Sequence, residues 1–526
     1  MFIGHHREEA KFELSRKSAP ELDVREEKTF DKTYVSESVK ANLAYMRKRY
    51  SVPQSSDVVI RRLTTKSGSD AFIIFFDGMV SNEYIDDNII KPLLELDGGD
   101  EVNKTATTHS QMQPLKDMDK ICDEINFGSC ALFVDGSDTA YVFDVRGWEH
   151  RGISRPENEQ SIYGPNEAFA EMLRTNTALV RKIIKTEKLI ALGCTVGRES
   201  KTRGVLLYIN DIANDKLVRE AKRRIDAIAA DYIISSEQVQ MLIEDKTLLL
   251  TPQMVATERP DRAARALSEG RCVFILNGSP RALILPSNAF ELTHAASDDY
   301  LNESFAIMSR VIRFIGMLLS LLLPAIYLAA TLYHRELIPT YLLYSISASR
   351  ENVPFPSLME MMLMDIAFEL IREAGIRMPS PIGPTLSIVG GLILGQAAVS
   401  AKIVSPIMII IIAITGIGSF ETADYSLGWT YRIMRQGFIV IAAGFGFFGI
   451  AAGIVAYSLY IGSIKTFGIR FLSPPLRIGG RSMVSAIMIN KIEKREKRPE
   501  FLKTKRVDSE PEISRRWEIK EQRGRK

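Results

Sequence analysis

The stretch IVGGLILGQAAVSAKIVSPIMIIIIAITGIGSF, residues 388–420, carries a single charged side chain, Lys402. A helix rises about 1.5 Å per residue, so about 20 apolar residues cross the roughly 30 Å hydrocarbon core of a bilayer. The uncharged windows Met378–Ala401 and Ile403–Phe420 meet or approach this length and leave Lys402 for a tight turn. This stretch therefore predicts two consecutive membrane helices.

Two more uncharged windows of membrane length lie on either side, at Phe314–Tyr333 and Gln436–Ile464. A soluble protein can bury one such helix, but four of them within about 150 residues indicate a membrane bundle. A fifth window, Leu337–Ser349, is too short to cross alone and is either half of a broken helix or a re-entrant segment. We expect a transmembrane bundle over residues 296–464.

Basic residues predict the orientation of this bundle, because positive charge favours the cytoplasmic side. Three groups of them mark that side: Arg310 with Arg313, Lys402, and the 18 Lys and Arg that face 8 Asp and Glu in residues 465–526. Four crossings with both ends in the cytosol place all three groups together. Arg432 and Arg435 then fall on the outer side and speak against this arrangement.

One helix inside the bundle, Leu358–Ile376, is bracketed by prolines and is amphipathic. Its charged side chains gather on one side of the helical wheel: Asp365, Glu369, Arg372 and Glu373. Such a helix either lines a water-filled path or lies at the membrane interface, and both alternatives stay open. In the first alternative, Asp365, Glu369 and Glu373 are candidates for an acidic pore mouth.

The start of that helix reads Ser357-Leu358-Met359-Glu360, which has the S-x-x-E spacing of a capping box. In this motif the serine caps the helix and the glutamate reaches back to the serine amide. We therefore assign Ser357 and Glu360 to a helix cap rather than to an ion path.

The window that starts at Met378 is rich in small residues, which usually let neighbouring membrane helices approach closely. The alternative is a helix turned toward a central conduit. Four of its residues would then share one face: Thr385, Leu392, Gln396 and Ser400.

The first three hundred residues have the composition of a soluble protein and contain an internal repeat. GSCALFVDGSDTA at residues 128–140 matches GRCVFILNGSPRA at residues 270–282, and each copy reads as a β-hairpin around Asp-Gly or Asn-Gly. We expect an α/β cytosolic region of two related lobes, residues 36–185 and 186–295, followed by the all-α multi-pass bundle. Residues 1–35 are expected to be a flexible charged lead-in and residues 465–526 a basic cytosolic tail.

Several strands and helices of these lobes are predicted from the pattern of apolar residues. The strands lie near 58–63, 71–76, 188–196 and 204–210, and the helices near 82–96, 115–126, 166–184, 215–229 and 259–268. The N-terminus lacks the apolar core of a signal peptide, which favours a cytosolic location for the lobes.

No arrangement of residues in the sequence predicts catalysis or metal binding. The cysteines, Cys122, Cys130, Cys194 and Cys272, form no CxxC pair and are expected to be reduced, mostly buried thiols. The common nucleotide, hydrolase and metalloprotease motifs are absent from the sequence. We therefore expect no enzyme activity and no cofactor. The net charge of +3 favours no particular partner, nucleic acid included.

Long stretches resemble the GerA family, the A subunits of nutrient germinant receptors of bacterial spores. The matching residues are 76–95, 155–182 (RPENEQSIYGPNEAFAEMLRTNTALVRK), 257–286 (TERPDRAARALSEGRCVFILNGSPRALILP), 298–304, 347–383 and 388–406. The resemblance covers about residues 36–475. The stretch DDYLNES at 298–304 departs from the family in lacking a second aromatic residue.

The resemblance implies a multi-pass protein of the spore inner membrane, with its N-terminal region and C-terminal tail on the core side. It implies a transporter-like B subunit, a lipoprotein C subunit and membrane lipid as partners. It further implies that A subunits oligomerise, as a pentamer, into a nutrient-gated channel that releases monovalent cations. The glycine-rich helix at 388–400 becomes the pore candidate, with Leu392, Gly391, Gly395, Gln396 and Ser400.

Other functions remain as alternatives. A secondary transporter would show inverted repeats, but the membrane half contains no duplicated segment. A paralogous spore membrane ion channel would share these motifs, and a membrane-anchored enzyme would need catalytic residues that the lobes do not display.

Overall fold

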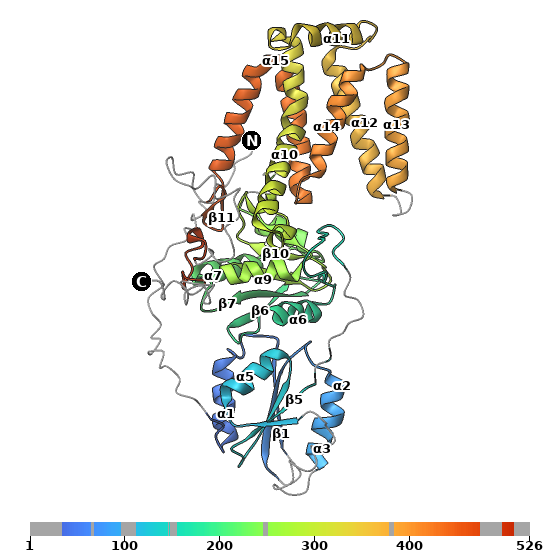
Figure 1. Ribbon diagram of the computed structural model, residues 1–526. Helices are drawn as coiled ribbons and strands as arrows, with labels where there is room; N and C mark the ends of the chain where they lie inside the picture. Colours follow the sequence, from blue (N-terminus) through green and yellow to red (C-terminus); the bar gives the residue numbers. More distant parts are fainter. Residues whose placement is uncertain are drawn as a thin grey trace, which may run out of the picture.

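Two β-sheets and a bundle of long helices follow one another along the molecule in the computed structural model (Figure 1). The structure describes residues 34–64, 68–95, 112–145, 147, 155–245, 251–377, 383–473 and 497–509. The expected lead-in therefore lies almost entirely outside the described residues. The second sheet lies between the first sheet and the helices.

The first sheet is antiparallel, with the strand order β1-β2-β4-β5-β3. Its strands are β1 (Val58–Thr64), β2 (Asp70–Phe76), β3 (Met112–Leu115), β4 (Cys130–Val134) and β5 (Ala140–Phe143). One face packs on α1 (Val39–Arg49) and α5 (Met118–Phe127). The other face packs on α2 (Asn82–Ile85), the π-helical turn η1 (Asp86–Ile90) and α3 (Lys91–Glu95). Burial on both faces explains why β2 and β4 are continuous apolar runs.

The second sheet has the equivalent order, β6-β7-β9-β10-β8. Its strands are β6 (Leu189–Val196), β7 (Thr202–Ile209), β8 (Val255–Thr257), β9 (Cys272–Leu276) and β10 (Ala282–Leu285). Helices α7 (Asp215–Asp226) and α8 (Ser236–Ile243) cover one face, and α6 (Leu173–Ile183) and α9 (Pro260–Glu269) cover the other. Both predicted hairpins, β4–β5 and β9–β10, are confirmed. Their turn glycines, Gly136 and Gly278, have φ of 82° and 87°, which favours glycine.

Two expectations for this region are corrected. The helix expected over 166–184 begins only at Leu173, since the residues before it form an irregular loop. Part of the expected charged tail belongs to the second sheet's core. The short strands β11 (Lys465–Thr466) and β12 (Ile469–Arg470) place Phe467 and Phe471 there, each fully buried. Apolar side chains spaced between the basic residues account for this packing.

The helical region comprises α10 to α15. Their bounds are α10 (Glu303–Leu332), α11 (Thr340–Arg350), α12 (Ser357–Arg377), α13 (Gly383–Ser400), α14 (Pro406–Phe420) and α15 (Tyr425–Gly462). Among the described residues, α10 and α15 are long and apolar enough to cross a membrane, and α14 is a shorter apolar helix. In Figure 1, α11 lies across the end of the bundle that is remote from the sheets.

Helix α15 is a helical hairpin rather than one straight rod. Gly446 has φ 60° and ψ −145°, which is outside the helical region. A Cβ placed on Gly449 would lie 2.7 Å from the Ile441 side chain, and one on Gly453 would lie 2.8 Å from Phe438. Residues eight positions apart in a straight helix are about 12 Å apart along its axis. The window predicted as one span therefore folds back on itself at Gly446.

The predicted orientation of the loops is corrected by this arrangement. Glu360, near the start of α12, binds Ser405, which caps α14. These helix starts lie together at the end of the bundle remote from the sheets, and so does the connection between α13 and α14, residues 401–405, which includes Lys402. Leu427, close to Arg432, packs instead in the core of the second sheet. The four-crossing scheme failed because α12 runs along the bundle and α15 reverses, which adds reversals of chain direction.

Candidate functional site

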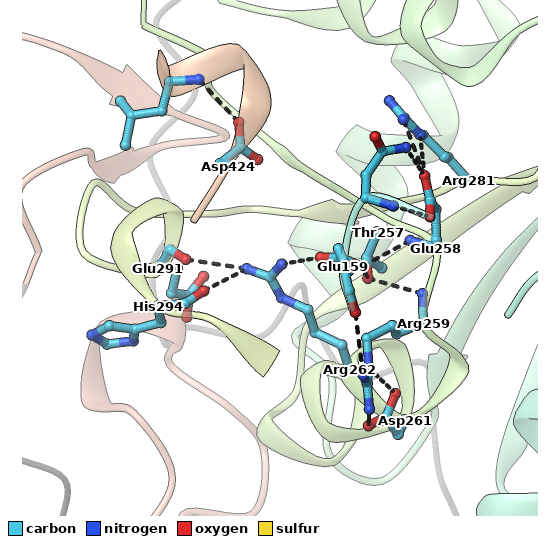
Figure 2. Close-up of polar contacts among 12 residues, drawn as sticks. Glu159, Thr257, Glu258, Arg259, Asp261, Arg262, Arg281, Glu291, His294 and Asp424 are labelled. Carbon is cyan, nitrogen blue, oxygen red and sulfur yellow. Dashed lines mark hydrogen bonds and ion pairs between the residues drawn. The ribbon is translucent and has the colours of Figure 1, made fainter. Parts of the chain in front are cut away.

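A polar junction connects the second sheet to the helices (Figure 2). The chain leaves β8 at Thr257 and starts α9 at Pro260, where proline suits the first helical position. Glu159, from the loop before α6, accepts hydrogen bonds from Thr257 Oγ1 (2.5 Å) and from the Glu258 amide (2.9 Å), and pairs with Arg262. A loop about a hundred residues earlier in the chain is thereby fixed to the start of α9.

A second carboxylate, that of Glu258, binds the same loop. Its carboxylate accepts from the amides of Glu157 (3.0 Å) and Asn158 (3.1 Å) and lies 3.1 Å from Arg281 Nη2. Burial alone would raise the pKa of Glu258, but the Asn158 hydrogen bonds and the Arg281 charge lower it below the usual value. Glu258 is therefore a carboxylate at neutral pH.

Arg259 is fully buried at the centre of the junction. Its guanidinium donates Nε and Nη2 to the two carboxylate oxygens of Asp261, at 3.0 and 2.9 Å, and Nη2 also donates to the Pro165 carbonyl at 2.9 Å. The Tyr300 hydroxyl donates to Asp261 at 2.5 Å. The planar guanidinium of arginine suits this two-oxygen geometry. Arg259 and Asp261 together connect the loop at Pro165 to Tyr300, in the segment just before α10.

Arg262 extends the network toward the helices. Its Nη2 donates to the carbonyl oxygens of Glu291 (3.2 Å) and His294 (3.3 Å). Figure 2 shows Asp424 nearby, where it caps α15 by accepting from the Leu427 amide at 3.0 Å. The start of α15 thus lies near Arg262, in the first turn of α9.

Asp298 fixes the beginning of α10. It is 1% exposed and contacts Arg310 Nε at 3.0 Å and Arg313 Nη1 at 3.1 Å. Burial alone would raise the pKa of Asp298, but hydrogen bonds and charge from Arg313 and Arg310 lower it below 3.8. The arginines expected to mark the cytoplasmic membrane boundary therefore also attach α10 to the residues that precede it.

Apolar packing reinforces the junction. Leu427 at the start of α15, and Ile464 and Phe471 after its end, belong to the same hydrophobic core as the second sheet. Both ends of the α15 hairpin are anchored in that core. Helix α15 is therefore attached to the second sheet through buried apolar contacts, and α10 is held at its base by the buried ion pairs of Asp298.

The sequence predicted one charged side on α12. In the structure this side faces the α15 hairpin of the same chain. Asp365 lies 2.9 Å from Arg435 Nη2, with both side chains 1% exposed, and Glu369 pairs with Arg432 and lies 3.5 Å from Arg372. The structure thus places Asp365 and Glu369 in an internal ion-pair network rather than at an open surface. Their pore-mouth role, and that of Glu373, stays a prediction for an assembly.

The predicted capping box at the start of α12 is corrected. Glu360 is fully buried, and its Oε1 accepts from the Ser405 amide at 2.6 Å and from Ser405 Oγ at 2.7 Å. Glu360 therefore joins α12 to the N-cap of α14, since the cap residue of a neighbouring helix competes for its carboxylate. Ser357 is the first residue of α12 and is also buried.

The pore candidates lie on α13, at the edge of the single chain (Figure 1). Gly391, Gln396 and Ser400 are exposed. Nothing lies within 4 Å of a Cβ placed on Gly391, whereas one on Gly395 would meet Ile409 at 3.9 Å. The side chain of Leu392 lies outside the described residues. The surface of α13 at Gly391 is thus open to another helix or to water.

Two adjoining cavities, of about 500 and 560 Å³, open between the first and second sheets. They share Asp77, Met172 and Arg174, and the Arg174 guanidinium lies 3.0 Å from the Asp77 carboxylate. Their size and mixed polarity would accept a small polar molecule. Among the residues that the structure describes, no cluster of three or more His, Cys, Asp or Glu is placed to hold a metal ion.

Sequence reasoning missed the junction. Its signals were the charged stretches RPENEQ at 155–160 and TERPD at 257–261. No spacing rule links residues about a hundred positions apart, so only the fold brings them together.

The fold and the junction define a protein in which two antiparallel α/β units are attached to a bundle of long apolar helices. A profile of the family described as Bacillus/Clostridium GerA spore germination protein matches residues 44–501. The chain belongs to this GerA family of spore germination proteins, as its sequence motifs predicted.

Several known proteins are similar to this chain in sequence. Spore germination protein KA of Bacillus subtilis (strain 168) is 36% identical over 474 residues, which cover 89% of this chain and 87% of that protein. The uncharacterized membrane protein YfkQ of the same strain is 37% identical over 423 residues, with coverage of 80% and 82%. The crystal structure of the N-terminal domain of the A subunit of the Bacillus megaterium spore germinant receptor GerK3 is 28% identical, with a TM-score of 0.38, and covers 48% of this chain and 97% of that chain.

Proposed function

We propose that this protein is the A subunit of a nutrient germinant receptor in the spore inner membrane. In this proposal several copies, five by the family resemblance, enclose a nutrient-gated channel that releases monovalent cations at the start of germination. A transporter-like B subunit and a lipoprotein C subunit complete the receptor. Membership of the GerA family and the apolar helices α10 and α15 support the proposal.

The observation that carries the mechanism is the attachment of α10 and α15 to the second sheet. Asp298 binds Arg310 and Arg313 at the base of α10, and both ends of α15 lie in the sheet's core. A ligand that favours one arrangement of the sheets then favours one arrangement of the helices, which is a population shift. In this proposal, a nutrient that binds the partner B subunit also acts on the helices by changing the arrangement of the second sheet.

The conduit in this proposal is formed by α13 helices from several copies. The open surface at Gly391 supports that location. A bulky apolar side chain among glycines forms a dewetting constriction, so Leu392 is the proposed gate. The lobes then face the spore core together with the C-terminal tail.

The proposal is tested by recording currents from the purified receptor in planar bilayers, with and without its partner subunits. We expect Leu392→Ala to raise the open probability without ligand, whereas Ile393→Ala, a 60% exposed neighbour on another face of α13, leaves it unchanged. Equal gating of wild type and Leu392→Ala would contradict the gate. Exchange of substrate with fixed stoichiometry would favour a secondary transporter, and currents indifferent to nutrients would favour a paralogous spore membrane ion channel.

A further inference from the structure

Two exposed apolar side chains stand at the tip of the loop that precedes α6. Ile162 is 92% exposed and Tyr163 is 57% exposed. A single exposed apolar residue is ordinary on a soluble surface. Two adjacent ones, with the isoleucine almost fully exposed, leave more apolar surface in contact with water. The position of the loop relative to α10 bears on what could contact these side chains.

The loop lies beside the start of α10. A Cβ on Gly164, the residue after Tyr163, would lie 2.7 Å from the Tyr300 ring, and α10 begins three residues after Tyr300. The first turns of α10 expose Phe305 (64%) and Met308 (61%). In Figure 1 the loop, drawn in blue-green after the grey connection from the first sheet, lies on the side of the second sheet that faces the helices.

The loop is held in place on both sides of its tip. Before the tip, Glu159 is bound by Thr257 and Arg262. After the tip, the Pro165 carbonyl accepts from the buried Arg259 at 2.9 Å. Within the tip, Ser161 Oγ donates to the Tyr163 carbonyl at 2.5 Å. The exposed side chains are therefore presented in a preorganised position, which lowers the entropic cost of any contact they make.

We propose that Ile162 and Tyr163 insert into the lipid interface on the side of the membrane that faces the sheets. The inference rests on the proposed membrane location of α10. The loop contacts Tyr300 just before α10, and the first turns of α10 expose the apolar side chains of Phe305 and Met308. The headgroup region of a bilayer that surrounds α10 would therefore lie within reach of the loop. A tyrosine beside an aliphatic residue suits this depth, because its ring is apolar and its hydroxyl stays hydrated.

Lipid contact by this loop would give the second sheet a second attachment to the membrane. The loop is joined through Glu159 and Glu258 to the junction at the start of α9. Its depth in the interface would then change together with any movement of the sheet relative to α10.

Site-directed spin labelling of the full-length chain in phosphatidylcholine and phosphatidylglycerol nanodiscs tests the proposal. The four native cysteines are buried, so a label directed to Ile162→Cys can be added without removing them. Two matched sites serve as references: Ile315→Cys on the exposed face of α10 (49%), and Tyr34→Cys beside the first sheet (62%). The readout is collision of the label with oxygen relative to a water-soluble nickel chelate.

We expect the oxygen-to-nickel ratio at Ile162→Cys to exceed that at Tyr34→Cys by at least about threefold and to approach that at Ile315→Cys. A ratio equal to that at Tyr34→Cys, with Ile315→Cys in lipid, would overturn the inference and leave the membrane location of α10 intact. An immobilised label reached by neither reagent would overturn it in favour of a protein contact. An aqueous ratio at Ile315→Cys would overturn the membrane location itself.

Discussion

Arg435 Nη2 lies 2.9 Å from Asp365 Oδ1, and each of the two side chains is 1% exposed. Gln436 also donates to Asp365. This pair joins α12 to the first limb of the α15 hairpin. Removing two charges from water is costly, and their attraction offsets that cost only while both partners are present.

Breaking this pair is therefore expected to destabilise the helical region. Asp365→Leu leaves the buried Arg435 guanidinium with only the more distant Glu369 carboxylate, 4.0 Å away, as a counter-charge. We expect a loss of about 3 kcal/mol. The double variant Asp365→Leu/Arg435→Met removes both charges and should recover most of that loss. Unfolding by sodium dodecyl sulfate from a mild detergent measures both. A single variant as stable as wild type would show that the pair does not hold the two helices together.

Close packing of α10 and α14 depends on glycine. A Cβ on Gly418 would lie 2.5 Å from the Gly316 carbonyl oxygen, an atom of the backbone that cannot move aside cheaply. We expect Gly418→Ala to destabilise the bundle by about 1–3 kcal/mol in the same unfolding assay. Gly437→Ala is the control, because nothing lies within 4 Å of its Cβ and alanine is the better helix former. Equal effects of the two substitutions would refute the packing argument.

The thiols are expected to be unreactive in the folded protein. All four cysteines are free and buried, which confirms the expectation from the sequence. Burial raises the pKa of Cys122 to about 11 and that of Cys272 to about 12, so the reactive thiolate is scarce at pH 8. A maleimide reagent at pH 8 should label none of them in mild detergent and all four after denaturation. Rapid labelling of the native protein would contradict the buried positions.

The attachment of α10 through Asp298 predicts a dependence on pH. Arg313 and Arg310 lower the pKa of this carboxyl in the folded protein below its ordinary 3.8. Its contribution to stability is therefore present above about pH 4 and is lost as the pH falls through the lower, folded value. Thermal unfolding of Asp298→Asn and wild type should differ by about 3 kcal/mol at pH 7, and the difference should shrink at lower pH.

An exposed carboxylate provides the comparison for Asp298. Asp138 pairs with Lys116 at 2.5 Å, with side chains 57% and 60% exposed. Asp138→Asn should change stability far less than Asp298→Asn does, because solvent screens the exposed pair. A loss at Asp138→Asn as large as that at Asp298→Asn would mean that burial at the base of α10 is not the cause.

Much of the fold followed from local patterns. The hairpins around Gly136 and Gly278 were predicted because Asp-Gly and Asn-Gly turns are defined within a few residues. The apolar windows predicted the positions of α10 and α14 for the same reason. The hairpin in α15 was missed, because Gly446 looks like any other small residue of an apolar helix.

The candidate site followed less well from the sequence. The wheel of α12 correctly grouped Asp365 with Glu369, but it could not say that Arg435 and Arg432 would face them. Glu360 was assigned to its own helix because the motif is local, whereas Ser405 lies 45 residues away.

The sequence by itself determined which segments are apolar enough to form long helices, where the two hairpins turn, and to which family the chain belongs. Those properties depend on neighbours along the chain. Only the tertiary structure decided the direction of each helix, the partners of the charges on α12, and the pairing of Glu159 with Arg262 at the start of α9. These depend on contacts between residues far apart in the chain, where burial makes each unpaired charge costly and therefore selects one arrangement.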